Sequence, residues 1–205
     1  MIHDELKPIL EIVRRKALEM KEVDLTFDTL NRLPEINMHL LRSHVETPDE
    51  LVEKLLEHEL GKFATFVDEI NPENHNSIDA MLMVSKKIAE NFHELFPSVS
   101  PQLKVLYPQA YMKQFERRIQ FISDKIRRNL NHGIQQGLYR SDLSSELIAR
   151  LYISRLIDIH NPELFPAETF SFPKLFNQMF ESLIRSIATP KGLEYFEHRK
   201  KHYSL

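Results

Sequence analysis

The sequence contains no cysteine among its 205 residues. This absence excludes disulfide bonds, thiolate zinc sites and a cysteine nucleophile, and it favours a reducing compartment such as the cytoplasm. Only four glycines are present against eleven prolines, which is typical of long helices with sharp ends. No apolar run approaches the roughly 20 residues that cross a bilayer, and the first residues lack the pattern of a signal peptide. We therefore expect a cytoplasmic protein that is not membrane-bound.

The chain also carries little net charge. Its formal charge is −3 at pH 7, and its hydrophobic and charged fractions, 42% and 28%, are ordinary for a globular protein with a real core. Such a molecule does not coat nucleic acid as a polycation. Any binding to DNA must therefore come from a local surface.

Apolar residues recur every three or four positions through nearly the whole chain, which is the period of an α-helix. No alternating strand pattern, internal repeat or low-complexity linker is present. The sequence therefore predicts an all-α fold of about nine to ten helices. The predicted helices cover residues 5–20, 26–33, 38–44, 48–70, 78–95, 101–107, 109–132, 145–159, 172–187 and 193–200.

A capping box at Thr47-Pro48-Asp49-Glu50 is the clearest helix start in the sequence. Asn37, Ser77 and Ser144 are predicted to cap three further helices. We place a domain boundary at the capping box, with residues 1–46 as one domain and residues 47–205 as the other. The first three helices are too few to bury much surface alone, so they should pack against the start of the fourth.

The first domain has the plan of a helix-turn-helix. Its second and third helices are short and joined by a tight turn. The third helix, Met38–His44, must be short and exposed enough to enter a major groove, while the second fixes its angle.

Residues 25–51 resemble the signature of the TetR (tetracycline-repressor, AcrR-type) family of transcriptional regulators. The matching positions are Thr26, Phe27, Asp28, Leu30, Ile36, Asn37, Leu41, Asp49, Glu50 and Leu51. Residues 137–143 and 189–192 are also similar to short sequence segments, here called phrases, that are common in that family. The resemblance implies an N-terminal three-helix DNA-binding head on a larger C-terminal helical bundle. It also implies a ligand-responsive regulator, expected to be a repressor, that binds operator DNA as a homodimer.

The resemblance assigns roles to three groups of residues. The implied DNA-binding residues are Thr26, Asn37, Met38, His39, Arg42, Ser43, His44 and Lys54. The dimer interface is expected on helices 145–159 and 172–187, with Tyr152, Leu156, Met179, Phe180 and Leu183. A pocket for a small apolar or amphipathic effector is expected at Phe66, Met81, Met83, Met112, Phe115 and Phe121. For His39 and Arg42, the competing interpretation is that they are ordinary solvated residues of a helix. For the last two groups, it is that these side chains are ordinary core of one chain.

The head departs from the family pattern in its turn and in its charge. Pro34-Glu35 occupies the turn where the family usually has Ala-Gly, and Glu35 adds a negative charge. Residues 1–56 contain eight Lys or Arg against twelve Asp or Glu, a formal charge of −4. Because DNA affinity comes largely from phosphate neutralisation, such a head is a weak or selective binder, or has lost the function. The alternative is a helical ligand-binding or protein-interaction module.

Other chemistry has little support in the sequence. His198 and His202 are spaced as a metal pair, but no third ligand is in register, so we expect no metal site and no cofactor. The sequence contains no nucleophile elbow, glycine-rich phosphate loop or His-Glu-x-x-His motif. A helical-bundle enzyme is the weakest hypothesis, because it would need several buried polar side chains to converge in the body, and we expect no catalytic residues.

Overall fold

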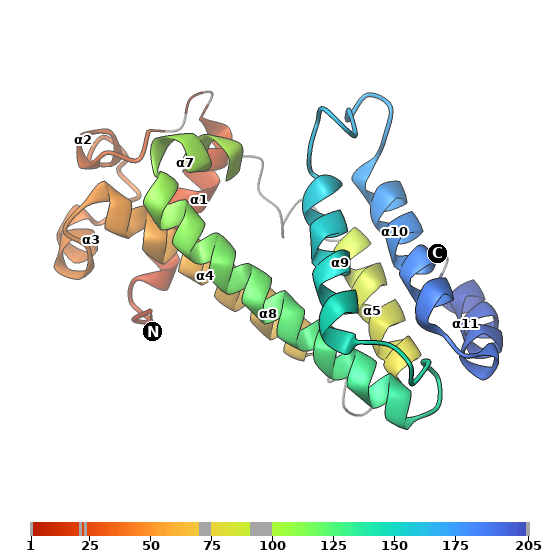
Figure 1. The fold of residues 1–205 in the computed structure, drawn as a ribbon. Coiled ribbons are helices and arrows are strands. Elements are labelled where there is room, and N and C mark those ends of the chain that lie inside the picture. Colours follow the sequence, from red (N-terminus) through yellow and green to blue (C-terminus); the bar gives the residue numbers. More distant parts are fainter. Residues whose placement is uncertain (1, 21, 23, 70–74, 91–99, 204–205) are drawn as a thin grey trace. The chain divides into compact units, whose positions relative to one another are not determined.

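The computed structural model describes residues 2–20, 22, 24–69, 75–90 and 100–203, and these form α-helices and no strand (Figure 1). The all-α prediction is confirmed. None of the described helices is both long and apolar enough to cross a membrane. The helices are α1 (Lys7–Glu19), α2 (Phe27–Leu30), α3 (Met38–His44), α4 (Pro48–Asp68), α5 (Ser77–Glu90), α7 (Ser100–Leu106), α8 (Pro108–Gln135), α9 (Ser145–Asp158), α10 (Phe172–Ile187) and α11 (Pro190–Tyr203).

The predicted capping box begins α4. The Glu50 backbone N–H donates to the Thr47 hydroxyl at 3.1 Å, and the Glu50 carboxylate accepts from the Glu46 backbone N–H at 2.8 Å. The first of these bonds satisfies a donor that the helix itself leaves without a partner, and the second satisfies a donor just before the helix. The predicted cap of α9 is confirmed as well, because the Ser144 hydroxyl accepts from the Leu147 backbone N–H at 3.3 Å.

The predicted cap of α5 was wrong by one residue. The Asp79 backbone N–H donates to the side-chain oxygen of Asn76 at 2.9 Å, so Asn76 is the cap and Ser77 is the first helical residue. Ser77 is fully buried, and asparagine caps a helix as well as serine does. The predicted end of this helix at Leu95 lies outside the described residues.

The chain divides into two compact units. Unit 1 comprises Met1–Thr65 and His93–Arg118, and unit 2 comprises Phe66–Phe92 and Ile119–Leu205. Helices α4 and α8 each contribute residues to both units. This division by packing does not test the functional boundary predicted at residue 47, which stays a prediction.

Unit 1 has one hydrophobic core, to which α1, α2, α3, α4, α7 and α8 all contribute. The first three helices pack against the start of α4, as expected, and also against α7 and the first turn of α8. The buried residues of this core are Leu6, Ile9, Leu10, Val13, Ala17, Leu25, Leu30, Ile36, Leu41, Val45, Leu51, Val52, Leu55, Leu103, Tyr107 and Ala110.

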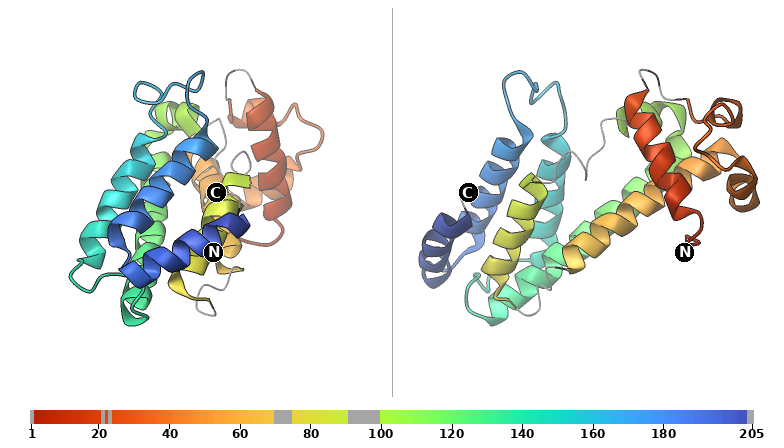
Figure 2. Two further views of the ribbon diagram at one scale, coloured as in Figure 1. Left: turned by 90° about the vertical axis from the view of Figure 1, so that its right-hand side faces the viewer. Right: turned by 180° about the vertical axis from the view of Figure 1, so that it is seen from behind.

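Unit 2 is a helical bundle in which α10 packs against α5 and α9, and α11 packs against α5 and α10 (Figure 2). Its largest fully buried side chains are Tyr139, Phe180 and Phe196. Helix α11 extends from Pro190 to Tyr203 and is longer than the predicted 193–200, because it has partners along its length. Ion pairs join Lys200 to Glu181 at 2.9 Å and Arg199 to Asp79 at 2.7 Å.

The two family-like phrases of the body lie against each other in unit 2. The Arg140 backbone N–H donates to the Ile187 carbonyl at 2.9 Å, and the Thr189 backbone N–H donates to the Leu138 carbonyl at 2.9 Å. Gly137, with φ at +69°, turns the chain out of α8 in a conformation that favours glycine. A Cβ atom at Gly192 would lie 2.0 Å from the Leu138 carbonyl oxygen, so the close approach of the two phrases requires glycine there.

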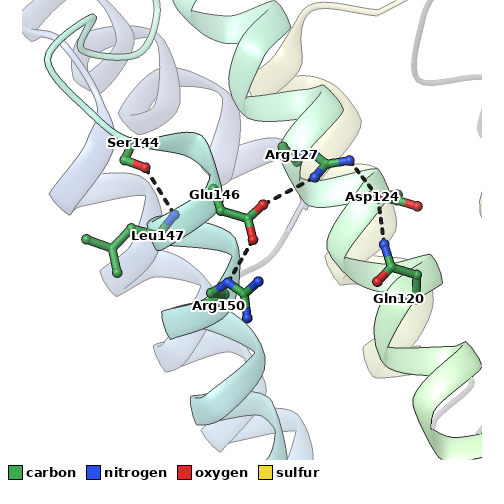
Figure 3. A network of polar contacts seen from close by, with 7 residues as sticks. All are labelled: Gln120, Asp124, Arg127, Ser144, Glu146, Leu147 and Arg150. Carbon is green, nitrogen blue, oxygen red and sulfur yellow. Dashed lines mark hydrogen bonds and ion pairs between the residues drawn. The ribbon is translucent and has the colours of Figure 1, made fainter.

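A chain of ion pairs joins α8 to the start of α9 (Figure 3). The Glu146 carboxylate accepts from Arg127 at 3.2 Å and from Arg150 at 2.7 Å, and Arg127 also donates to Asp124 at 2.8 Å. The two guanidinium groups lower the pKa of Glu146, which therefore remains ionised at neutral pH. All four side chains are partly exposed, so the network orients α9 more than it stabilises the fold.

Candidate DNA-binding site

Residues 26–45 form a helix-turn-helix whose two helices are both capped by side chains. The Thr26 hydroxyl accepts from the Thr29 backbone N–H at 3.4 Å, and the side-chain oxygen of Asn37 accepts from the Leu40 backbone N–H at 3.0 Å. The predicted extent of the third helix, Met38–His44, agrees with α3. The second is shorter than predicted and ends at Leu30, because the chain turns there with 3.0 Å backbone bonds that span only three residues.

Helix α3 presents one face to the core of unit 1 and the other to solvent. Leu41 is completely buried, and Met38 and Leu40 are partly buried against the same core. His39, Arg42 and Ser43 are exposed. A helix anchored by a buried leucine and carrying polar side chains outward has the form needed to enter a groove.

Two contacts hold the basic side chains at this surface. The Arg42 guanidinium lies 5.1 Å from the centre of the Phe27 ring on α2, which is a cation–π distance. The His44 ring lies 4.9 Å from the His3 ring. Neither partner was predicted. The Phe27 contact follows from the angle between α2 and α3, which periodicity alone does not give.

The remaining predicted DNA-binding residues lie at the edges of this surface. Thr26 and Asn37 are exposed and occupy the capping positions of α2 and α3. Lys54 lies in the second turn of α4, and its ammonium group is 3.7 Å from the Glu57 carboxylate. Its charge is therefore partly neutralised within the chain.

Acidic groups surround the helix-turn-helix. Hydrogen bonds from the Thr29 hydroxyl at 2.5 Å and the Thr26 backbone N–H at 2.9 Å lower the pKa of Asp24. The carboxylate of Glu35, in the turn before α3, lies 3.4 Å from the Lys16 ammonium group. A hydrogen bond from the backbone, and to a smaller extent the contact with Lys16, lowers the pKa of Glu35. Both carboxylates are charged at neutral pH, so Asp24 adds a negative charge before α2 and Glu35 adds one in the turn before α3.

The predicted effector residues are divided between the two units. Met112 and Phe115 belong to unit 1, and Phe66, Met81, Met83 and Phe121 belong to unit 2. Met112 is 43% exposed, and Phe115 stacks on Tyr111 at 6.1 Å between ring centres. Lysine ammonium groups lie over the other two rings, Lys87 at 4.4 Å from Phe66 and Lys125 at 5.4 Å from Phe121. Their role in binding an effector stays a prediction.

The five predicted dimer residues are buried within the single chain. Tyr152, Leu156, Met179, Phe180 and Leu183 are between 2% and 8% exposed, so each has little surface left to bury against a second copy. Their contact with a partner stays a prediction, and their packing within unit 2 agrees with the competing interpretation as core.

Exposed apolar side chains lie elsewhere on α9. Leu147 and Leu151, one helical turn apart, are 55% and 51% exposed. Leu164 and Phe170, in the connection between α9 and α10, are 56% and 41% exposed. These residues are apolar in the sequence, but α9 is apolar on more than one side. The sequence therefore does not predict which side of α9 is exposed, and the packing of the helices decides it.

The arrangement of the chain is shared with solved regulators. No protein-family model matches the sequence, and no curated protein does. A transcriptional regulator from Cytophaga hutchinsonii has a TM-score of 0.72 at 14% identity, over 91% of this chain and 100% of that one. SmeT, the repressor of the Stenotrophomonas maltophilia multidrug efflux pump SmeDEF, has a TM-score of 0.69 at 11% identity, over 92% of both chains. A TetR transcription regulator from Haloarcula marismortui has a TM-score of 0.67 at 17% identity, over 91% and 99%.

The chain has the TetR fold. The likeness covers about nine-tenths of the sequence, so it includes the helix-turn-helix as well as the body. At such low sequence identities the structural likeness shows the fold alone and assigns no role to any residue. The head of this TetR-fold protein has Pro34-Glu35 in its turn and His39 and Arg42 on the outward face of α3.

Proposed function

We propose that the protein is a cytoplasmic, ligand-responsive transcriptional regulator, most simply a repressor, that binds operator DNA as a homodimer. The observation that carries the proposal is the outward face of α3. His39, Arg42 and Ser43 extend from a helix that a buried leucine and an asparagine cap hold in place. Within the TetR fold, residues 1–46 then form the DNA-binding domain and residues 47–205 the effector-binding and dimerisation domain. Neither role involves catalysis.

Arg42 is the side chain best suited to read a base. A guanidinium can donate two hydrogen bonds to the major-groove edge of guanine, and stacking on Phe27 limits its freedom before binding. His39 and Ser43 flank it, while Asn37, Met38 and His44 complete the helix. Thr26 and Lys54 would meet phosphates in this proposal. Because few of these groups are permanently charged, specific contacts must supply more of the affinity than in a basic head.

We propose that two copies associate through the outer side of α9. Leu147 and Leu151 form an apolar pair one turn apart, each more than half exposed, and a second copy would cover them. A symmetric pair would present two α3 helices to two half-sites of one operator. The five residues predicted for the interface would support this surface from beneath.

The test is a mobility-shift assay of the full chain on DNA upstream of its own gene. Arg42→Ala should weaken binding by at least about tenfold, the cost of losing one bidentate base contact. Arg117→Ala, an exposed arginine on α8, is the matched control and should leave binding unchanged. Equal loss in the two variants would remove Arg42 from the reading surface.

The acidic head favours one alternative, a helical ligand-binding or protein-interaction module that no longer reads DNA. The same assay separates the two functions when the salt concentration is lowered. A regulator binds more tightly as salt falls, because phosphate contacts release counterions. Absence of any shifted band at low salt, on upstream and random-sequence DNA alike, would favour the module.

A further inference from the structure

A polar row lies on the buried side of α8 in unit 1, among side chains that are otherwise apolar. Gln114 is 4% exposed, and neither its amide nitrogen nor its amide oxygen has a hydrogen-bond partner among the described residues. Arg118 follows one turn later and Tyr111 precedes by one turn. Residues three and four apart on a helix are neighbours, so the three polar groups form one row.

Among the described residues, aromatic contacts with this row come from α4 and from α8 itself. The Arg118 guanidinium lies 5.3 Å from the centre of the Phe63 ring on α4. Burial is the main cause that lowers the pKa of Arg118, and it also raises the pKa of Tyr111. Phe115 stacks on Tyr111. The row therefore combines hydrogen-bonding groups with aromatic walls in a place largely shielded from water.

One charged pair acts electrostatically on the row. Glu59 of α4, whose charge acts on Arg118, forms an ion pair with Arg14 of α1 at 3.0 Å, and both side chains are mostly buried. This pair connects α1 of the helix-turn-helix to α4. A group that bound at Arg118 would change the field at Glu59, and through it the contact between the two helices.

An unpartnered buried amide is costly to a folded protein, by more than most single interactions contribute. A ligand that binds reversibly would supply the missing hydrogen-bond partner of such a group. An amide and a guanidinium side by side provide N–H donors that suit a carboxylate, and the aromatic rings suit an apolar body. Aliphatic carboxylates combine the two.

We infer that Gln114 and Arg118 bind the carboxylate of an amphipathic effector, whose apolar part lies against Phe63 and Phe115. This inference names the class of effector and rests on the proposed function only for its regulatory meaning. Phe115 is one of the six residues predicted for the effector pocket. Binding here would favour one arrangement of α1 on α4 over another and so shift the population of heads that can bind DNA.

The first test needs no ligand. Gln114→Met has nearly the same shape and removes the amide, so it should raise the melting temperature of the full chain by about 2 °C or more. Gln109→Met, at an exposed position on the same helix, is the matched control and should change it little. A fall in melting temperature for Gln114→Met would show that the amide has a structural partner, and would overturn the inference.

The second test uses straight-chain carboxylates from hexanoate to tetradecanoate, each measured by calorimetry beside the alcohol of equal length. We expect the wild-type chain to bind at least one carboxylate about tenfold more tightly than its alcohol, a difference typical of one charge-assisted contact. Arg118→Met should abolish that preference and Arg117→Met should keep it. If Arg118→Met does not fold, Arg118→Gln replaces it.

Either of two results would overturn the inference: no carboxylate binds more tightly than its alcohol, or the preference survives the loss of Arg118. Neither measurement involves DNA. If carboxylates bind as expected while no operator is bound, the site stands and the proposed regulator fails. If DNA binds and carboxylates do not, the regulator stands and the effector class is wrong.

Discussion

Arg199, near the end of the chain, donates to the carboxylate of Asp79 at 2.7 Å across 120 residues of sequence. The same carboxylate accepts from the Tyr195 hydroxyl at 2.6 Å and from the Asn76 amide at 3.2 Å. Asp79 lies in the first turn of α5, where a negative charge is favourable, and is 9% exposed. One carboxylate thus joins the last helix of the body to the start of α5.

Replacing this carboxylate tests how strongly α11 is held. Asp79→Asn keeps the shape of the side chain but loses its charge. The free energy of unfolding should therefore fall by about 1–3 kcal/mol. Asp142→Asn, which removes the exposed pairing with Arg140, is the control and should cost much less. Urea denaturation followed by circular dichroism measures both. Equal costs would mean that the Asp79 contacts add nothing beyond a surface ion pair.

Glu181 predicts a dependence of stability on pH. Hydrogen bonds from Lys200 and then Arg185 lower its pKa from the ordinary 4.5, so folding favours the charged carboxylate. A lowered folded-state pKa contributes stability that is complete above 4.5 and is lost as the pH falls through the folded-state value. Glu181→Gln should therefore cost up to about 1 kcal/mol at pH 7 and progressively less below pH 4.5. A deficit that is constant with pH would contradict this assignment.

The outer side of α9 predicts how the proposed dimer is broken. Leu151→Glu should convert the chain to a monomer in sedimentation velocity, because a charge facing a second copy would be buried without a partner. Val105→Glu, at a 78% exposed position in unit 1, should leave the dimer intact. Circular dichroism should show both variants folded. A Leu151→Glu variant that still sediments as a dimer would move the interface elsewhere.

Glu35 predicts a gain of DNA binding. Glu35→Gln removes a negative charge from the turn before α3 and leaves Lys16, which lies 3.4 Å away, with Glu19 as its remaining carboxylate partner. Affinity for operator DNA should rise roughly threefold at moderate salt and by more at low salt. Glu116→Gln, an exposed position on α8, is the control. Fluorescence anisotropy titrations would decide, and unchanged affinity would place Glu35 away from the phosphates.

Two glycines predict opposite effects on stability. Gly192→Ala would place a Cβ atom against the Leu138 carbonyl and should destabilise unit 2 by about 2 kcal/mol or more. Gly61→Ala has open space within α4 and should stabilise by about 0.5–1 kcal/mol, the helix-propensity difference. Thermal unfolding of the two variants measures both signs. Tolerance of alanine at 192 would mean that the two phrases can move apart.

The sequence by itself determined the helices and most of their starts. Local bonding between residues a few positions apart decides these features, as at Thr47 and Ser144, where one side chain meets a backbone N–H three residues on. It missed by one residue at α5, where Asn76 and Ser77 are both good caps and burial chose between them. The extent of α3 was also predictable, because Asn37 and the apolar period agree there.

Only the tertiary structure decided which side of each helix is buried. Five apolar residues predicted to face a second copy are inside the chain, while Leu147 and Leu151 face outward. Gln114 is not one of the periodic apolar positions of α8, yet it is deeply buried, one turn from Arg118. The physical reason is that burial depends on contacts between helices distant in sequence, and a helix that is apolar on several sides permits more than one packing. The sequence limits those packings, and the sum of long-range contacts selects one.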